Sequence, residues 1–594
     1  MRIQHSSLTG CWGRSRLCLP ILISVVLAGA LVAAPLRPVH APHAMVASVH
    51  ELASRAGVEM LRSGGNAVDA AVATGFALAV VHPQAGNLGG GGFLLLRRAN
   101  GKTRFIDFRE KAPAAATENM YLDSAGNVIP ESSKNSSVVG YRAIGVPGTV
   151  AGLVYAEKQY GKLSLEKVIA PAIKLAREGF TLTYEDARDF KEDEYLAEFP
   201  PSKHIFLRDG NFYQPGDLFK QPELARTLER LAQDPDTFYH GAMAHELAAA
   251  IHQGGGLVTA ADLAAYEVKE REPIRGSYRG FEIISAPPPS SGGVALVEIL
   301  NILEGFDLAK LGNRSADVIH LEAEAFRRAF YDRADFMGDP DFAKVPVAQL
   351  IDKKYAAAWR ESIDLNRATL SQDLKRPPIF SELERVARLR PSAIREPENT
   401  THYSVVDAEG NAVAVTTTLN DSFGSRVTAA GLGFLLNDEM DDFAAKQGVP
   451  NNYGLIQGPA NAIGPGKRPL SAMTPTIVLR KDGSGNSELF LVMGSPGGPT
   501  IITTVANILI GVVDFSLDIQ EAVNAPRFHH QWLPDQILVE DRLSPDTMSV
   551  LRSRGHKLSL EHFWGDGECI MIDSRTGERL GASDGRNNGK AVGY

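Results

Sequence analysis

The chain has 594 residues, of which 44% are hydrophobic and 22% charged, and its formal net charge is −9. These values are ordinary for a large folded protein, and they exclude a disordered, collagenous or multi-span membrane chain. Since no stretch is densely basic, a nucleic-acid partner is not expected.

The first residues have the layout of a secretory signal peptide. Three arginines fall among the first 16 residues, an uncharged stretch runs from Leu17 to Leu36, and small residues follow. We expect a leader over residues 1–41, cut between 30 and 44, and a periplasmic or secreted protein. An uncleaved membrane anchor is the alternative, since 20 apolar residues can span a bilayer.

Only three cysteines occur, and two of them, Cys11 and Cys18, fall in the leader. Its removal would leave Cys569 alone, with no partner for an intramolecular disulfide. The same count excludes a zinc site built mainly from cysteine.

In chain order, the first two-thirds is mainly helical. An Ala- and Val-rich stretch, 66–82, predicts a helix buried on nearly every side, and glycines at 86 and 89–92 precede two strands. The expected elements here are strands at 93–96 and 104–108, helices through most of 152–263, a helix at 294–303 after the break at 286–293, and a surface segment at 365–398.

The last third reads as antiparallel hairpins. Alternating or β-branched runs are separated by short Gly-, Asn- and Asp-containing turns. The predicted pairs are 402–406 with 412–419, 476–480 with 489–493, and 569–573 with 580–582, with a buried helix at 501–513. This order predicts an α+β fold in which helical layers pack over sheets.

Several familiar catalytic, zinc-binding and nucleotide-binding motifs are incomplete or absent in this sequence. The G-x-S-x-G match at Gly581–Gly585 has neither a following helix pattern nor a later histidine. His245 and His252 are seven residues apart rather than the four of a zinc helix. No nucleotide-binding glycine fingerprint stands between a strand and a helix, and the glycines at 89–92 favour close backbone packing instead. The sequence therefore predicts no cofactor and no metal.

A set of separate blocks together resembles the γ-glutamyltranspeptidases. The resemblance runs from about residue 42 to Tyr594. Its blocks are Phe108–Glu110, Pro287–Gly293, Thr400–Asp407, Asn420, Asp441–Asp442, Arg468–Ser471, Gly494–Gly498 and Asn524–Trp532.

The resemblance implies a four-layer αββα N-terminal nucleophile hydrolase that cuts itself between Asn399 and Thr400. Residues 42–399 would form the large subunit and 400–594 the small subunit of a heterodimer, interleaved in one domain. The cut has a chemical purpose, because it converts the Thr400 amide into an α-amine with a reference pKa of about 7.7–8.0. That amine can serve as general base for the neighbouring hydroxyl.

The resemblance also assigns roles to residues. Thr400 would be the nucleophile, Thr418 would orient its amine, and the N–H groups of Gly497 and Gly498 would form the oxyanion hole. Arg109 and Ser471 would bind the substrate α-carboxylate, Asn420, Glu439 and Asp442 its ammonium, and Tyr453 would cover it. Ala472 departs from the family, in which many members carry a second serine.

The implied donors are glutathione and other γ-glutamyl compounds, and the implied acceptors are water, amino acids or dipeptides. Two alternatives are open. One is a glutaryl-preferring cephalosporin acylase of the same fold, against which the amine-binding set of Asn420 and Asp442 argues. The other is a catalytically inactive binding relative, against which Thr400, Thr418 and the two glycines argue.

Overall fold

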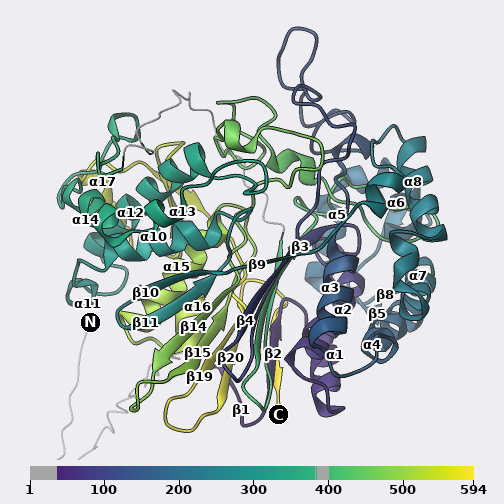
Figure 1. Cartoon of the computed structure of the whole chain (residues 1–594), viewed down its shortest axis with the longest axis horizontal. Helices are drawn as coiled ribbons and strands as arrows, with labels where there is room; N and C mark the ends of the chain where they lie inside the picture. Colours follow the sequence, from purple (N-terminus) through teal and green to yellow (C-terminus); the bar gives the residue numbers. More distant parts are fainter. Residues whose placement is uncertain (1–36, 381–382, 384–399) are drawn as a thin grey trace, which may run out of the picture. The chain divides into compact units, whose positions relative to one another are not determined.

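Two seven-stranded antiparallel sheets form the centre of the molecule (Figure 1). The computed structural model describes residues 37–380, 383 and 400–594. Sheet A has the strand order β1 (Val39–Ala41), β20 (Arg579–Ala582), β19 (Cys569–Ile572), β15 (Ser487–Met493), β14 (Thr476–Lys481), β11 (Phe281–Ser285) and β10 (Ile274–Tyr278). Sheet B has the order β21 (Lys590–Gly593), β2 (Met45–Ser48), β12 (Thr401–Val406), β13 (Ala412–Thr418), β3 (Gly91–Arg97), β4 (Thr103–Phe108) and β9 (Lys269–Arg271).

The two sheets pack face to face, which makes the strands of sheet B apolar on both faces. Successive side chains of a strand point to opposite faces. In β3, Phe93 and Leu95 join the core shared with sheet A, whereas Leu94 and Leu96 join the core under the outer helices. The result is a helix–sheet–sheet–helix sandwich, which confirms the predicted αββα class.

Helices cover the outer face of each sheet (Figure 1). Over sheet B lie α1 (Glu51–Arg62), α2 (Ala67–Val81), α3 (Thr149–Tyr160), α4 (Leu165–Glu178), α5 (Tyr184–Glu192), α6 (Pro200–Phe206), α7 (Pro222–Gln233), α8 (Ala242–Gln253) and α9 (Ala260–Ala264). Over sheet A lie α10 (Gly292–Leu303), α11 (Leu308–Leu311), α12 (Ala316–Phe336), α13 (Val347–Leu350), α14 (Lys353–Glu361), α15 (Thr500–Val513), α16 (Ile519–Asn524) and α17 (Pro545–Ser553). Smaller sheets pair β5 (Phe180–Thr181) with β8 (Leu218–Phe219), β6 (Leu207–Arg208) with β7 (Asn211–Phe212), and β17 (Ile537–Glu540) with both β16 (Phe528–His529) and β18 (Leu558–Glu561).

The predicted helices and hairpins are present. Every residue of α2 is buried, as its unbroken Ala/Val pattern indicated, and a capping box between Asn66 and Asp69 starts it. The hairpins β12–β13, β14–β15 and β19–β20 follow the expected bounds within two residues.

The prediction that 365–398 is a surface segment is wrong in part. Residues 381–382 and 384–398 lie outside the described residues. Before them, Ser371 is buried and donates to the carbonyl of Trp532 at 2.7 Å. The Arg376 side chain is only 4% exposed and pairs with Asp332 and, at 2.7 Å, with Asp335. Frequent prolines and charges suggested a solvated loop, but ion pairs to α12 hold this segment against the core.

Most of the expected leader lies outside the described residues, which begin at Arg37. Val39–Ala41 form an edge strand of sheet A, paired with Arg579–Gly581. A cut after Ala41 would remove this strand, so the geometry favours the earlier end of the predicted range. In residues 37–380, 383 and 400–594, no helix combines the length and apolar character needed to cross a membrane.

Candidate active site

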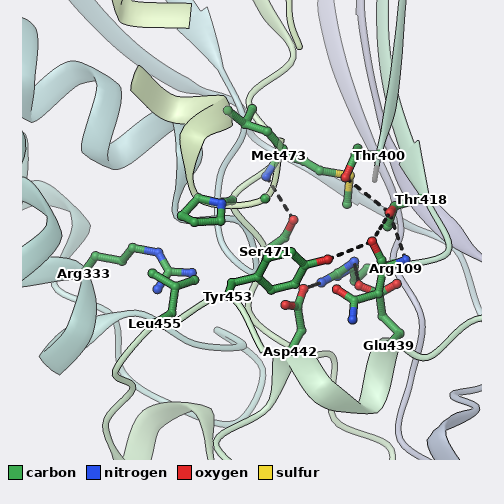
Figure 2. A pocket seen from close by; sticks show the side chains of 15 residues that line it. Arg109, Arg333, Thr400, Thr418, Glu439, Asp442, Tyr453, Leu455, Ser471 and Met473 are labelled. Carbon is green, nitrogen blue, oxygen red and sulfur yellow. Dashed lines mark hydrogen bonds and ion pairs between the residues drawn. The ribbon is translucent and has the colours of Figure 1, made fainter. Parts of the chain in front are cut away.

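The hairpin β12–β13 brings Thr400 opposite Thr418. Thr401 pairs with Thr417, so the next pair outward joins Thr400 and Thr418, whose side chains share a face. Their hydroxyl oxygens are 3.3 Å apart, and the backbone N–H of Asn420 donates to the Thr418 hydroxyl at 2.9 Å (Figure 2). The other residue of the predicted cut, Asn399, lies outside the described residues.

Close backbone packing fixes the end of β13. A Cβ on Gly90 would stand 2.0 Å from the carbonyl oxygen of Thr418, so this contact requires glycine. The Asn87 amide also donates to that carbonyl, at 2.9 Å. The packing role predicted for the glycines at 89–92 is confirmed.

Gly497 and Gly498 form the loop between β15 and α15. Their φ angles are +127° and +50°, a region that favours glycine. Gly498 lines the same cavity as Thr400, and a Cβ placed on it would stand 2.9 Å from Cδ1 of Tyr453. Because α15 starts at Thr500, the loop also lies at the positive end of a helix dipole.

Arg109 is buried at the end of β4 and is already ion-paired. Its guanidinium contacts Glu439 and Asp442, and Glu110 lies 3.5 Å away. Although burial opposes the charge, these carboxylates hold the pKa of Arg109 above its ordinary value. The predicted carboxylate-binding residue is therefore joined directly to two of the predicted ammonium-binding residues.

The acidic residues come from the short 3₁₀ helix Glu439–Asp442. Burial raises the pKa of Glu439 well above its ordinary value and that of Glu110 to about 7. Asn420, at a φ of +84°, donates to the backbone carbonyl and a carboxylate oxygen of Asp438, each at 3.3 Å. The site therefore has a buried, acid-rich end.

Tyr453 and Ser471 close the cavity. Tyr453 is only 3% exposed, and its hydroxyl donates to the carbonyl of Asn420 at 2.8 Å. Ser471 accepts a hydrogen bond from the N–H of Met473 at 3.0 Å. Figure 2 shows the Tyr453 ring lying across the site between Asp442 and the threonines.

One cavity collects the predicted residues. Its lining contains all of the predicted catalytic and substrate-binding residues except Gly497, which is adjacent to the lining residue Gly498. The lining also includes residues without a predicted role, among them Arg333 and Leu455. Sequence patterns gave no signal for Arg333, because it lies in the charged stretch of α12, where an arginine ordinarily faces solvent.

Thr400 also borders a second cavity. Its polar lining comprises His82, Gln84, Asp566 and Asn587. Asp566 is buried and accepts a hydrogen bond from the Asn587 amide at 3.0 Å. Burial raises the pKa of Asp566 to about 7 and lowers that of His82 to about 3, so near neutral pH the imidazole is uncharged and the carboxyl group is partly protonated.

Comparison with known proteins agrees with this geometry. The family model for gamma-glutamyltranspeptidase matches residues 53–594. The chain is 51% identical over 553 residues to a glutathione hydrolase proenzyme from Escherichia coli (strain K12), covering 93% of this chain and 91% of the relative.

Two solved structures have folds similar to that of this chain. A gamma-glutamyltranspeptidase chain from Helicobacter pylori matches 56% of this chain and 95% of its own length at 47% identity, with a TM-score of 0.54. A cephalosporin acylase from Bacillus halodurans matches 96% of this chain and 99% of its own length at 27% identity, with a TM-score of 0.81. With the family model spanning nearly the whole described chain, this protein belongs to the gamma-glutamyltranspeptidase family.

Proposed function

We propose that this protein is an autoprocessed γ-glutamyltransferase and glutathione hydrolase. It would cleave the γ-glutamyl amide of glutathione and related compounds and pass the γ-glutamyl group to water, amino acids or peptides. The observation that carries the proposal is the placement of Thr400 beside Thr418, in a cavity whose far end holds Arg109, Glu439 and Asp442.

Processing comes first. The Thr400 hydroxyl attacks the carbonyl of Asn399, and the peptide nitrogen becomes the α-amine of Thr400 as an ester forms. Water then hydrolyses the ester and frees the Thr400 hydroxyl. The product is a small subunit, residues 400–594, whose first residue carries both a nucleophile and a base. We place export of the precursor to the periplasm or outside the cell before or alongside this step.

Turnover uses the same two groups. The α-amine takes the proton of the Thr400 hydroxyl as the oxygen attacks the γ-carbonyl of the donor. The amine leaving group departs with a proton, and a γ-glutamyl ester remains on Thr400. The developing oxyanion would be held by the N–H groups of Gly497 and Gly498, of which Gly498 lines the cavity beside Thr400.

Donor selection follows from the charges of the cavity. The ammonium of a γ-glutamyl group has three candidate partners, Asn420, Glu439 and Asp442, and the carboxylate has Arg109 and Ser471. Tyr453 would cover the bound acyl group, and the hydrogen bond from its hydroxyl to the Asn420 carbonyl would hold the ring in place.

The second cavity beside Thr400 suits the incoming acceptor. It borders Thr400 but none of Arg109, Glu439 and Asp442, and its polar groups can hydrogen-bond to water or to a neutral amine. We assign it to water and to amino acid or dipeptide acceptors. The leaving amine would occupy the same space before them.

The main rival is a glutaryl acylase of the same fold. A glutaryl group has no ammonium, so Asn420, Glu439 and Asp442 would have no substrate cation to bind. The 51% identity to a glutathione hydrolase proenzyme, over 93% of this chain, also favours the γ-glutamyl donor. An inactive binding relative would have no need for the Thr400–Thr418 pair.

A donor panel tests the proposal. Purified protein would be assayed with γ-glutamyl and glutaryl anilides, each with and without a dipeptide acceptor. We expect release of the anilide from the γ-glutamyl donor, stimulation by the dipeptide and weak glutaryl turnover. A preference for the glutaryl donor would establish the acylase, and no turnover of either would support the binding relative.

A further inference from the structure

Arg333 is a buried cation in the donor cavity that has no role in the proposed mechanism. It lies near the end of α12, is 3% exposed and lines the cavity with Thr400 and Asp442. In Figure 2 its side chain points toward Leu455 and Tyr453. Its Nε donates to the Ser291 hydroxyl at 2.9 Å, while its Nη1 is buried and has no hydrogen-bond partner among the described residues.

This arginine differs from the buried arginines around it. Arg109 pairs with Glu439 and Asp442, and Arg468 pairs with Asp107. Among the side chains that the structure describes, no carboxylate lies within 4.0 Å of Arg333. Burial lowers the pKa of Arg333 to about 10 while Asp442 opposes that change, so the group stays cationic at neutral pH.

A buried charge without a counterion is costly, and an incoming anion removes that cost. Arg109 cannot offer the same gain, because Glu439, Asp442 and Glu110 already surround it. The ammonium and carboxylate of an α-amino acid are borne on one carbon. Such a zwitterion needs an acidic partner and an unneutralised cation around one cavity, and Asp442 and Arg333 supply them.

We propose that Arg333 binds the α-carboxylate of the γ-glutamyl donor and thereby contributes to donor specificity. The assignment rests on the proposed function and adds a guanidinium to the carboxylate partners, Arg109 and Ser471. It also gives a role to the Pro287–Gly293 block, because Ser291 accepts from Arg333 and donates to the backbone carbonyl of Ser471 at 2.7 Å. Ser291 thus fixes the guanidinium relative to the rest of the carboxylate-binding end.

Comparing two donors that differ only in the α-carboxylate tests the role of Arg333. A 4-aminobutanoyl anilide is the γ-glutamyl anilide without its α-carboxylate, and it keeps the ammonium and the scissile bond. For Arg333→Gln we expect KM for the γ-glutamyl anilide to rise roughly tenfold to a hundredfold, with kcat changed less than threefold, since a hydrogen bond to a charged group is lost. For the 4-aminobutanoyl anilide, kcat/KM should change less than threefold.

Three further variants separate binding from folding. Arg333→Lys keeps the charge and should recover part of the KM loss, and Ser291→Ala should raise KM less than Arg333→Gln. Arg314→Gln is the matched control, because Arg314 also has an unpartnered Nη1 but does not line the cavity. Arg314→Gln should change kcat/KM by the same factor for the two donors. Cleavage into two subunits, seen on a gel, shows which variants have folded and matured.

An equilibrium measurement removes the dependence on turnover. L-Glutamate should raise the melting temperature of the wild type more than 4-aminobutanoate does, and Arg333→Gln should abolish that difference. The proposal would be overturned if Arg333→Gln lowered kcat/KM equally for both donors and L-glutamate still raised its melting temperature more than 4-aminobutanoate does. Arg333 would then be a structural residue. If Arg333→Gln does not mature, an unchanged donor ratio in Arg333→Lys and Ser291→Ala would overturn the proposal as well. A wild type that cleaves no γ-glutamyl anilide would instead contradict the proposed function.

Discussion

Asp442 is the acidic residue that acts on both arginines of the donor cavity, Arg109 and Arg333. Its carboxylate pairs with Arg109 and also acts on the pKa of Arg333. Asp442→Asn should therefore weaken γ-glutamyl donors, because truncating one partner of a buried charge pair costs about 2–5 kcal/mol. We expect kcat/KM for a γ-glutamyl anilide to fall by roughly 30-fold or more.

A glutaryl anilide is the internal control for Asp442→Asn, since it lacks the ammonium and should lose much less. Equal losses in kcat/KM for the two donors would mean that Asp442 supports the site but does not distinguish the amine.

Most individual site residues could be named from the sequence, but only because separate blocks resemble one family. A threonine such as Thr400 is unremarkable by itself, and pattern alone could not have paired it with Thr418. The ion pairs of Arg109 and the cavity position of Arg333 depend on how α12, β4 and the 3₁₀ helix Glu439–Asp442 meet. Such three-dimensional contacts leave no periodic signal.

At the scale of elements, the loop joining β15 to α15 sets the position of the proposed oxyanion donors. Gly498→Ala should lower kcat for the γ-glutamyl anilide roughly tenfold or more. The new Cβ would meet Tyr453 at 2.9 Å and displace donors whose individual loss costs about 10²–10³ in rate.

Gly431→Ala is the control for Gly498→Ala. Gly431 has a φ of +75°, but a Cβ there meets nothing within 4 Å. Both variants therefore place alanine at a positive φ, and only Gly498→Ala adds a steric clash. If both variants lowered kcat alike, the loop would not have the role given to it.

Helix α3 carries a buried acid that makes stability depend on pH. Burial, followed by the charge of Asp69, raises the pKa of Glu157 from 4.5 to about 9. Asp69 accepts backbone hydrogen bonds from Asn66 and Leu163 at 2.7 and 2.6 Å, which hold its carboxyl group in position.

Between pH 4.5 and 9 the folded chain holds the Glu157 proton that the unfolded chain releases, so stability falls as pH rises through this window. Glutamine does not titrate. The melting temperature of Glu157→Gln relative to wild type should therefore increase steadily from pH 5 to pH 9, as measured by calorimetry. A difference that stays constant across this range would contradict the raised pKa.

The elements themselves were largely predictable. The periodicity of 2 in the hairpins and the unbroken apolar run of α2 came directly from the chain, because burial selects those patterns. The segment before residue 381 was mistaken for surface, since Arg376 is neutralised by acids far away in sequence that no local pattern reveals.

For the whole molecule, the proposed cut would divide both sheets. In sheet B, β2 from the large subunit lies between β21 and β12 of the small subunit, and in sheet A, β14 of the small subunit pairs with β11 of the large subunit. Separating the subunits would break both sheets and expose the core.

The two proposed subunits should therefore elute together on native size exclusion and separate only in denaturant. Uncut Thr400→Ala protein provides the size reference. Separate elution in native buffer would show that the strands of the two subunits are not interleaved as described.

The intact mass of purified protein, wild type beside Thr400→Ala, tests the central claim most directly. The claim is that Thr400 is first the agent of the cut and then the catalytic residue that the cut creates. Wild type should give two chains, the smaller matching residues 400–594 with Thr400 at its amino terminus, and Thr400→Ala should give one uncut, inactive chain. A wild type that stays a single chain, or a Thr400→Ala protein that yields the same two chains, would contradict the account.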